Sequence, residues 1–224
     1  MIKENVSQII KEIPINVEIE AAVKNRTPEE ILEAIEAGIR IIGENYVQET
    51  KSIIKLVNRD EVRIHFIGHL QRNKVNKAVE VFDMIETVDS FKLASWIDGA
   101  AKDINKIMPV LIEINIARER QKFGVIPEDT EAVIRDISIL KNIRIMGLMT
   151  MGPLVSDIED LRPYFRNTKK LFIKIKDLNL NNVFMQYLSM GMSSSYKIAI
   201  EEGANIVRIG SYIFGARQKG NKID

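Results

Sequence analysis

Short runs of apolar and β-branched residues alternate along the chain with longer segments in which apolar residues return every three or four positions. The first pattern is typical of buried strands and the second of amphipathic helices. A helical segment is expected after each of the short runs. The short runs predict eight strands, at Val17–Val23, Ile39–Ile42, Arg63–Ile67, Met84–Val88, Met108–Ile114, Ile143–Met149, Val183–Leu188 and Asn205–Ile209.

Local signals mark where several of the helices begin. Thr27-Pro28-Glu29-Glu30 combines an N-cap threonine, a proline in the first turn and a glutamate at the capping-box position. Gly38 is expected to end this helix. Pro127-Glu128-Asp129 predicts the start of another helix, and a long helix is expected within Asp157–Asn179.

Strands that each precede a helix indicate parallel pairing with right-handed crossovers. A doubly wound sheet and a (β/α)₈ barrel both have this pattern. We favour the barrel, because polar and glycine-rich clusters follow nearly every strand, and a barrel collects those strand ends on one face. The 224 residues suit a compact barrel, and neither a linker nor a repeat divides them. We therefore expect residues 1–224 to form a single (β/α)₈ domain.

Composition narrows the functional classes. A net charge of +1 creates no overall field that would favour nucleic acid or a membrane. The chain has no cysteine, which excludes disulfides, thiolate catalysis and cysteine-based zinc sites, and with two histidines we expect no metal site. The N-terminus lacks the apolar core of a secretory signal, and no apolar run reaches the roughly 20 residues that span a bilayer. We expect a cytoplasmic protein.

Lys24 is the first candidate for chemistry, because it directly follows a predicted buried strand. Removal from water disfavours the charged form of a lysine and frees its amine to attack an aldehyde. The alternative is a lysine that extends its ammonium group to solvent at the barrel mouth.

Glycine- and serine-containing clusters follow the last two predicted strands. Ser189–Ser193 follows the seventh strand, Ser193–Ser195 is expected to begin the next helix, and Gly210 and Ser211 follow the eighth strand. Glycine lets backbone N–H groups approach a phosphate, and serine adds hydroxyl donors. Barrels often bind phosphate after strands seven and eight, so we predict a phosphate site here in preference to ordinary helix caps. Its candidate residues are Ser189, Gly191, Ser193, Gly210 and Ser211.

One amine and a phosphate site predict a phosphorylated aldehyde cofactor, for which pyridoxal 5'-phosphate (PLP) is the obvious candidate. Arg208 could face the pyridine nitrogen and keep it unprotonated, or it could form an ion pair at the rim. Asn45 could bond to the cofactor or cap a helix. His65 could line the pocket or be a satisfied core group. Met149 and its neighbours could pack against a flat ring or simply fill the core.

Seven ordered motifs together resemble the pyridoxal phosphate homeostasis protein family (YggS/PROSC), which is similar to the barrel domain of alanine racemases. The motifs are Ala22-Val23-Lys24, Gly43–Glu49, His65–Lys74, Lys122-Phe123-Gly124, Gly147–Met151, Ser189–Ser193 and Val207–Arg217, the last of which ends in Phe214-Gly215-Ala216-Arg217.

The resemblance implies a barrel that holds PLP as a Schiff base on Lys24. It implies that Arg208 lies beside the pyridine nitrogen, that Ser193, Gly210 and Ser211 bind the phosphate, and that Asn45 lines the pocket. His65 is implied there as well. The implied role is vitamin B6 homeostasis, in which PLP is buffered or delivered, with PLP-dependent apo-enzymes as candidate recipients. Robust turnover is not part of that role.

The chain also departs from the family. Val23 and Asn25 stand where serine and threonine are common beside the lysine, and four steps instead of three separate Lys24 from Pro28. We expect no room for the C-terminal β-domain of a racemase, which favours a monomer and leaves two-base chemistry without its second base.

Two rival functions remain open at this stage. The alternative within the same cofactor class is a weak PLP-dependent amino-acid racemase in which Tyr46, His65 or a water would serve as the second base. A sugar-phosphate isomerase with Glu113 as its base would account for the phosphate site but leaves Lys24 without a role.

Overall fold

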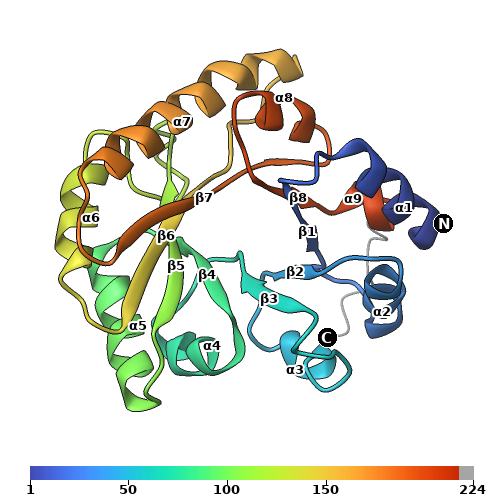
Figure 1. Ribbon diagram of the computed structural model, residues 1–224, viewed down its shortest axis with the longest axis horizontal. Helices are drawn as coiled ribbons and strands as arrows, with labels where there is room; N and C mark the ends of the chain where they lie inside the picture. The colour runs from blue at the N-terminus through green and yellow to red at the C-terminus, as the bar shows by residue number, and fades with distance from the viewer. Residues whose placement is uncertain (217–224) are drawn as a thin grey trace.

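The computed structural model describes residues 1–216, so the predicted motif residue Arg217 lies outside the described residues. Eight parallel strands close into a barrel in sequence order within this range, and the helices surround it (Figure 1). The predicted (β/α)₈ fold is therefore confirmed. The strands are β1 Glu18–Ala22, β2 Ile41–Glu44, β3 Arg63–Phe66, β4 Met84–Val88, β5 Met108–Ile114, β6 Ile143–Thr150, β7 Val183–Met192 and β8 Ile206–Ile209.

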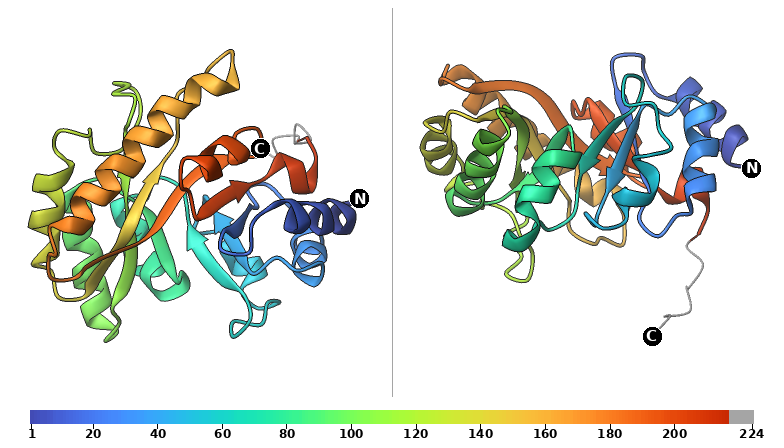
Figure 2. Two further views of the ribbon diagram at one scale, coloured as in Figure 1. Left: turned by 45° about the horizontal axis from the view of Figure 1, so that its top comes forward. Right: turned by 90° about the horizontal axis from the view of Figure 1, so that it is seen from below.

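A helix follows each strand, as the sequence predicts, and a further helix, α1, precedes β1; two short 3₁₀ turns lie among the helices. Figure 2 shows the long α7 running along the outside of β6 and β7, which it contacts. The α-helices are α1 Ile2–Glu12, α2 Pro28–Glu36, α3 Thr50–Ile53, α4 Val75–Val81, α5 Phe91–Asp103, α6 Thr130–Ser138, α7 Arg162–Asp177, α8 Tyr196–Glu201 and α9 Ser211–Phe214, and the 3₁₀ turns are η1 Arg72–Lys74 and η2 Ile158–Leu161.

The start of α2 has the predicted capping box. Thr27 Oγ1 accepts from the Glu30 N–H at 3.3 Å, and the Glu30 carboxylate accepts from the Thr27 N–H at 2.9 Å. The first bond satisfies a backbone N–H group in the first turn of the helix. The second satisfies the N–H group of the residue at which the chain enters the helix. This box sets the point at which the chain leaves β1 and turns into α2.

One helix start differs from the predictions. Ser193–Ser195 does not form the first turn of a helix, because β7 continues to Met192 and α8 starts only at Tyr196, with Ser195 as its N-cap residue. The long helix expected within Asp157–Asn179 is confirmed as α7, which has Pro163 in its first turn and is preceded by the 3₁₀ turn η2.

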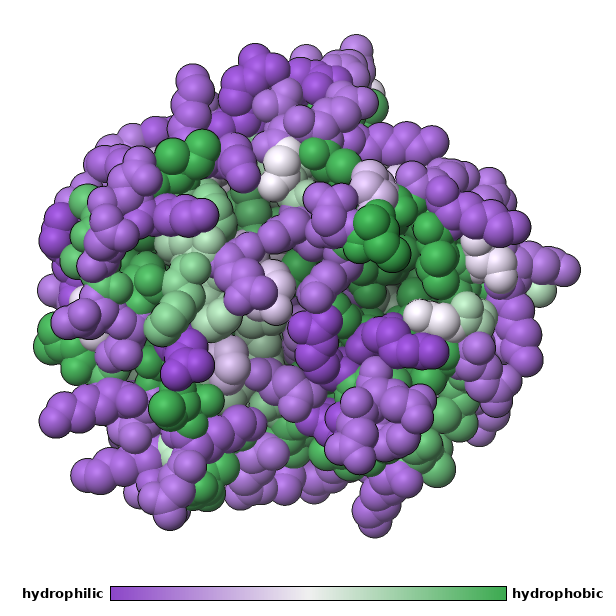
Figure 3. All heavy atoms as spheres, viewed as in Figure 1, coloured by the Kyte–Doolittle hydropathy of each residue, from purple (hydrophilic) through white to green (hydrophobic). Residues whose placement is uncertain are grey.

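The main apolar core lies between the strands and the surrounding helices, where residues such as Ile42 and Ile64 are fully buried. Burying each large aliphatic side chain contributes roughly 1.5–3 kcal/mol. Polar side chains cover most of the periphery of the face in Figure 3, while apolar ones gather toward its middle. Among the described residues, no helix combines the length and apolarity required to cross a bilayer.

The barrel interior has two layers. Met84 and Ile206 belong to a small apolar cluster, together with Leu111 and Met149. Two residues further along the same strands are Glu86 and Arg208, which are also buried. Because side chains alternate with a period of two along a strand, these residues point into the interior one layer closer to the carboxyl ends. The interior is therefore apolar in the layer nearer the amino ends of the strands and charged in the layer nearer their carboxyl ends.

Gly147 offers a test of the close contact between β6 and β7. A Cβ at this position would clash with the Tyr187 carbonyl oxygen and lie 2.7 Å from its carbonyl carbon. We expect Gly147→Ala to lower the free energy of unfolding by about 3 kcal/mol, because the backbone must move to relieve the overlap. Urea unfolding of the purified proteins measures this change.

Gly99 is the matched control for this substitution. It lies on the exposed side of α5, and a Cβ there would meet no atom within 4 Å. Gly99→Ala should raise the free energy of unfolding by about 0.5–1 kcal/mol, because alanine restricts the unfolded chain. Equal effects of the two substitutions would contradict the close β6–β7 contact.

Candidate functional site

A cavity of about 600 Å³ opens at the carboxyl ends of the strands, beside β1, β7 and β8. Its walls come from residues that end or follow six different strands, as is usual for sites on this face of a barrel. The lining residues are Ala22, Lys24, Arg26, Asn45, Ile67, Met151, Met192, Ser193, Ser194, Arg208, Gly210 and Ser211.

Lys24 lies in the cavity wall just beyond β1 and is half-buried. The preceding residue, Val23, is buried, and its N–H donates to the Gly43 carbonyl on β2 at 3.1 Å. Asn25 then adopts a left-handed conformation, with φ 58°, which turns the chain toward α2. The Lys24 amine lies 5.1 Å from the centroid of the Tyr46 ring. Backbone on both sides of Lys24 thus directs a primary amine into the cavity.

Hydrogen-bond donors converge at the turn after β8. Ser193 Oγ accepts from the N–H of Gly210 at 3.1 Å and from the N–H of Tyr212 at 3.2 Å. Ser211 lies between these two residues and belongs to the same cavity wall. Converging backbone N–H groups and hydroxyls suit the oxygens of a phosphate, which accept several hydrogen bonds at once.

Arg26 ties the far end of this turn to the start of α2. Its guanidinium donates to the carbonyl of Phe214 at 3.1 Å and to that of Gly215 at 2.6 Å, and it pairs with Glu30 at 3.3 Å. Arg26 also lines the cavity, so its positive charge favours an anion beside it. Both ends of the turn from Gly210 to Gly215 are therefore held by side chains of the cavity wall.

Arg208 forms the inner end of the cavity and is 5% exposed. Its Nη1 donates to Ser189 Oγ at 2.6 Å, and its Nη2 donates to the Thr150 carbonyl at 2.8 Å. Each of the two terminal nitrogens makes one of these bonds, so residues that do not line the cavity fix the plane of the guanidinium. A guanidinium has donors and no acceptor, so it can only donate to a group in the cavity.

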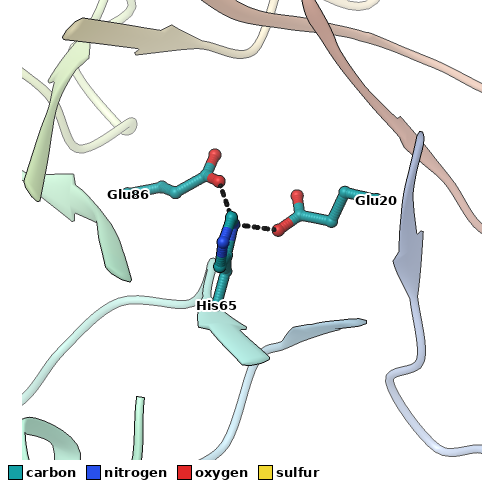
Figure 4. Close-up of side chains that lie close together, drawn as sticks. All are labelled: Glu20, His65 and Glu86. Carbon is teal, nitrogen blue, oxygen red and sulfur yellow. Dashed lines mark hydrogen bonds and ion pairs between the residues drawn. The ribbon is translucent and has the colours of Figure 1, made fainter. Parts of the chain in front are cut away.

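Behind Arg208, the side chains of Glu20, His65 and Glu86 meet inside the barrel (Figure 4). His65 Nδ1 lies 2.9 Å from Glu86 Oε1 and 3.1 Å from Glu20 Oε1, and all three side chains are at most 1% exposed. Burial by itself would lower the pKa of His65, but its close contacts with both glutamates and their charges raise it to about 9. The imidazole is therefore positively charged near neutral pH.

Burial, together with the charge of Glu86, raises the pKa of Glu20 to about 7, against the opposing effect of His65 and Arg208. Burial also acts to raise the pKa of Glu86, but His65, Arg208 and Ser189 outweigh it, so this pKa is lowered. Glu86 is thus ionised at neutral pH, while Glu20 titrates close to it.

The structure brings together six of the residues predicted for the site. Lys24, Asn45, Ser193, Arg208, Gly210 and Ser211 all line this cavity. The other four do not line it. Ser189 lies behind Arg208, Gly191 lines a neighbouring cavity, Met149 is part of the apolar layer, and His65 lies in the barrel interior.

Among Met149 and its neighbours, expected to pack against a ring, Met151 lines the cavity in place of Met149, because it lies beyond the end of β6 at Thr150. Other residues of the site were missed from the sequence. Arg26, Ile67 and Met192 were not singled out. Glu20 and Glu86 were missed as well, although a glutamate in the middle of an otherwise apolar strand is a detectable signal of a buried charge. Glu113 lines a separate cavity with Met151 and Phe123.

Comparison with known proteins identifies the type of barrel. The family model "Alanine racemase, N-terminal domain" matches residues 1–218. An alanine racemase from Clostridium difficile has a TM-score of 0.81 at 14% identity, and the match covers 100% of this chain and 58% of the racemase. The described barrel therefore has the fold of the N-terminal domain of alanine racemases.

Closer relatives define the family. A pyridoxal phosphate homeostasis protein from Aquifex aeolicus is 39% identical, over 88% of this chain and 86% of its own length. The counterpart from a Synechocystis strain is 35% identical, over 94% of this chain and 96% of its own. PipY of Synechococcus elongatus, solved with PLP bound, has a TM-score of 0.88 at 31% identity and covers 96% of this chain and 100% of PipY. The chain belongs to the pyridoxal phosphate homeostasis protein family.

Glu44 generates a prediction on pH dependence. It ends β2 and is 2% exposed, and burial together with the charge of Glu49 raises its pKa from 4.5 to about 8. The folded protein therefore holds this proton more tightly than the unfolded chain. The resulting stability is complete below the ordinary pKa and is lost as the pH rises through about 8.

The free energy of unfolding of the wild type should fall between about pH 5 and pH 8. We expect this fall to be smaller in Glu44→Gln by on the order of 1–3 kcal/mol. Urea unfolding at both pH values measures the difference. Glu80→Gln, at a half-exposed surface carboxylate, is the control and should leave the pH dependence unchanged. A parallel pH dependence in the wild type and Glu44→Gln would contradict this assignment.

Proposed function

We propose that this protein binds PLP reversibly and contributes to vitamin B6 homeostasis by buffering or delivering it. One observation carries the proposal: a primary amine, a set of converging phosphate-type donors and a buried guanidinium line one cavity. These are the groups that an aldehyde, a phosphate and an aromatic nitrogen each require. The family membership and the PLP-bound PipY structure support the same cofactor.

PLP supplies an aldehyde and an electron-withdrawing pyridine ring when it is bound. In this proposal Lys24 would hold PLP covalently through its primary amine, in a linkage that would form with loss of water and that water would reverse. The Ser193 and Ser211 hydroxyls would donate to the phosphate, the N–H of Gly210 would exchange its bond to Ser193 for one to the phosphate, and Arg26 adds positive charge beside them.

Arg208 favours a carrier over a catalyst in this proposal. Because a guanidinium can only donate, it leaves a pyridine nitrogen beside it without a proton. An unprotonated ring withdraws electrons from a reacting centre less strongly than one whose nitrogen is paired with a carboxylate. Arg208 therefore contributes orientation and hydrogen bonding instead of activation.

Neither Tyr46 nor His65, the side chains that the racemase alternative would use as its second base, is among the described residues that line the cavity, which leaves a water for that role. Of the candidates from the sequence, His65 is buried in the barrel interior and Tyr46 lines a neighbouring cavity together with Lys74.

Turnover, the monomeric state, cytoplasmic location and transfer to apo-enzymes stay predictions. Deuterium exchange at the Cα of an amino acid tests turnover, and we expect no exchange above that of free PLP.

Lys24 is the decisive residue for the proposed bond. Wild-type protein mixed with PLP should show a visible absorption band, and borohydride should fix the cofactor on Lys24, as read by peptide mass mapping. Lys24→Ala should lose both signals. Lys74→Ala is the matched control, since Lys74 also lies at the mouth but lines the neighbouring cavity. A band that persists in Lys24→Ala, or a label on another lysine, would refute the assignment.

Ser211 tests the phosphate site separately from the amine. We expect Ser211→Ala to weaken PLP binding by about tenfold, or roughly 1.4 kcal/mol, because one hydroxyl donor to a charged group is lost. Binding of pyridoxal, which has no phosphate, should be unchanged. Ser211→Thr keeps the hydroxyl and should retain most of the affinity. Equal losses for PLP and pyridoxal in equilibrium titrations would argue against phosphate binding at this turn.

A further inference from the structure

The Glu20–His65–Glu86 cluster consists of charged side chains that are almost completely removed from water. The exposed fractions of these side chains are 0% for Glu20, 1% for His65 and 0% for Glu86. Burying charged groups is costly unless other charges and hydrogen bonds compensate them. The proposed binding reaction uses none of the three, so their role in the barrel needs a separate explanation.

Hydrogen bonding inside the cluster is incomplete. His65 Nδ1 carries at most one hydrogen, and it bonds to Glu86 Oε1 at 2.9 Å. Within residues 1–216, both oxygens of Glu20 and the Oε2 of Glu86 accept no hydrogen bond of good geometry. The two carboxylates therefore depend on positive charge nearby more than on direct donors.

Arg208 is the second positive charge that faces this cluster. It is paired in register with Glu20 across the contact between β1 and β8, and its charge lowers the pKa of both Glu20 and Glu86. Its own hydrogen bonds go to neutral acceptors, Ser189 Oγ and the Thr150 carbonyl. A buried guanidinium with neutral direct partners needs carboxylates beyond hydrogen-bond distance to balance its charge.

Ser189 joins the cluster to Arg208. Its oxygen accepts from Arg208 at 2.6 Å, which leaves the hydroxyl proton free to point elsewhere, and the hydroxyl helps to lower the pKa of Glu86. Glu113, on β5, also faces Arg208, and burial and the charge of Asp89 raise its pKa to about 7. When Glu20 and Glu86 are both ionised and Glu113 holds its proton, these two carboxylates, the imidazolium and the guanidinium sum to zero charge.

We propose that the Glu20–His65–Glu86 cluster is a positioning device for Arg208, which holds the guanidinium in its orientation at the inner end of the cavity. This inference rests on the proposed function in one respect only, the contact between Arg208 and the ring of a bound cofactor. Of these four charged side chains, Arg208 is the one that lines the cavity, so the cluster acts on a bound molecule through it.

A divalent cation is the competing occupant of the cluster. One ligand atom from each of the three residues lies within 4.8 Å of the others, which is compact enough to surround an ion. Two carboxylates, a neutral imidazole and a divalent cation sum to zero, and Arg208 would then add an unbalanced buried positive charge. A proton on His65 instead leaves the interior neutral. Charge balance favours the proton.

Exchange of the Arg208 guanidinium hydrogens with water tests this proposal without any cofactor. Protein with ¹⁵N-labelled arginine is compared by NMR, and Arg208→Lys assigns the Arg208 signal. We expect slow exchange in the wild type and exchange at least tenfold faster in Glu86→Gln, which removes one charge at constant size. The pKa of His65 should fall in the same variant, and the chain has two histidines to resolve.

Glu44→Gln is the matched control, because Glu44 is a buried glutamate on β2 that lies outside the cluster. It should leave the exchange of the Arg208 hydrogens unchanged. Ser189→Ala is the second variant in case Glu86→Gln does not fold. It keeps all four charges but removes the connecting hydroxyl, so Arg208 exchange should accelerate at least tenfold while His65 remains positively charged at neutral pH.

Unchanged Arg208 exchange in the folded Glu86→Gln or Ser189→Ala protein would overturn the proposal. A stoichiometric divalent ion in wild-type protein that disappears in Glu86→Gln, measured by elemental analysis, would overturn it in favour of a metal site. In PLP-loaded protein, Glu86→Gln should release PLP at least tenfold faster. If wild-type protein binds no PLP while Arg208 exchange responds as expected, the positioning role stands and the proposed function fails.

Discussion

Closing the strands into a barrel removes water from its interior, so every charge that points inward must be balanced by another inward-pointing group. Glu20, His65, Glu86 and Arg208 meet this requirement together, in a layer directly above the apolar cluster that contains Met84. The cavity begins where this layer ends. Its inner end is therefore the Arg208 guanidinium, and the charged side chains behind it do not line the cavity.

The outer part of the site depends on backbone more than on charge. Val23 and Asn25 set the direction of Lys24, and the bonds from Gly210 and Tyr212 to Ser193 shape the turn after β8. A rigid amine and a preformed donor set reduce the entropy lost on binding a small phosphorylated aldehyde. With Arg208 limited to donating, this combination suits holding and releasing a cofactor better than driving a reaction with it.

Most of the fold could be read from the chain, because a strand buried on both faces leaves an unbroken apolar run and a capped helix leaves a local signature. The predicted strands match the observed ones within a few residues, and the Thr27 capping box is present. The predicted seventh strand ends at Leu188, whereas β7 continues to Met192. The backbone turn at Gly191 lies against Tyr196 and Ala199, which come after the strand in the sequence, so the strand pattern does not record it.

The sequence by itself determined the strand order, the parallel barrel and the mouth positions of Lys24, Ser193 and Arg208, since all of these follow from local pattern and from the rule that strand ends share a face. Only the tertiary structure decided that Glu20, His65 and Glu86 meet, and that Met151 instead of Met149 reaches the cavity. The physical reason is that contacts across a barrel depend on the stagger between neighbouring strands. No local pattern records that stagger.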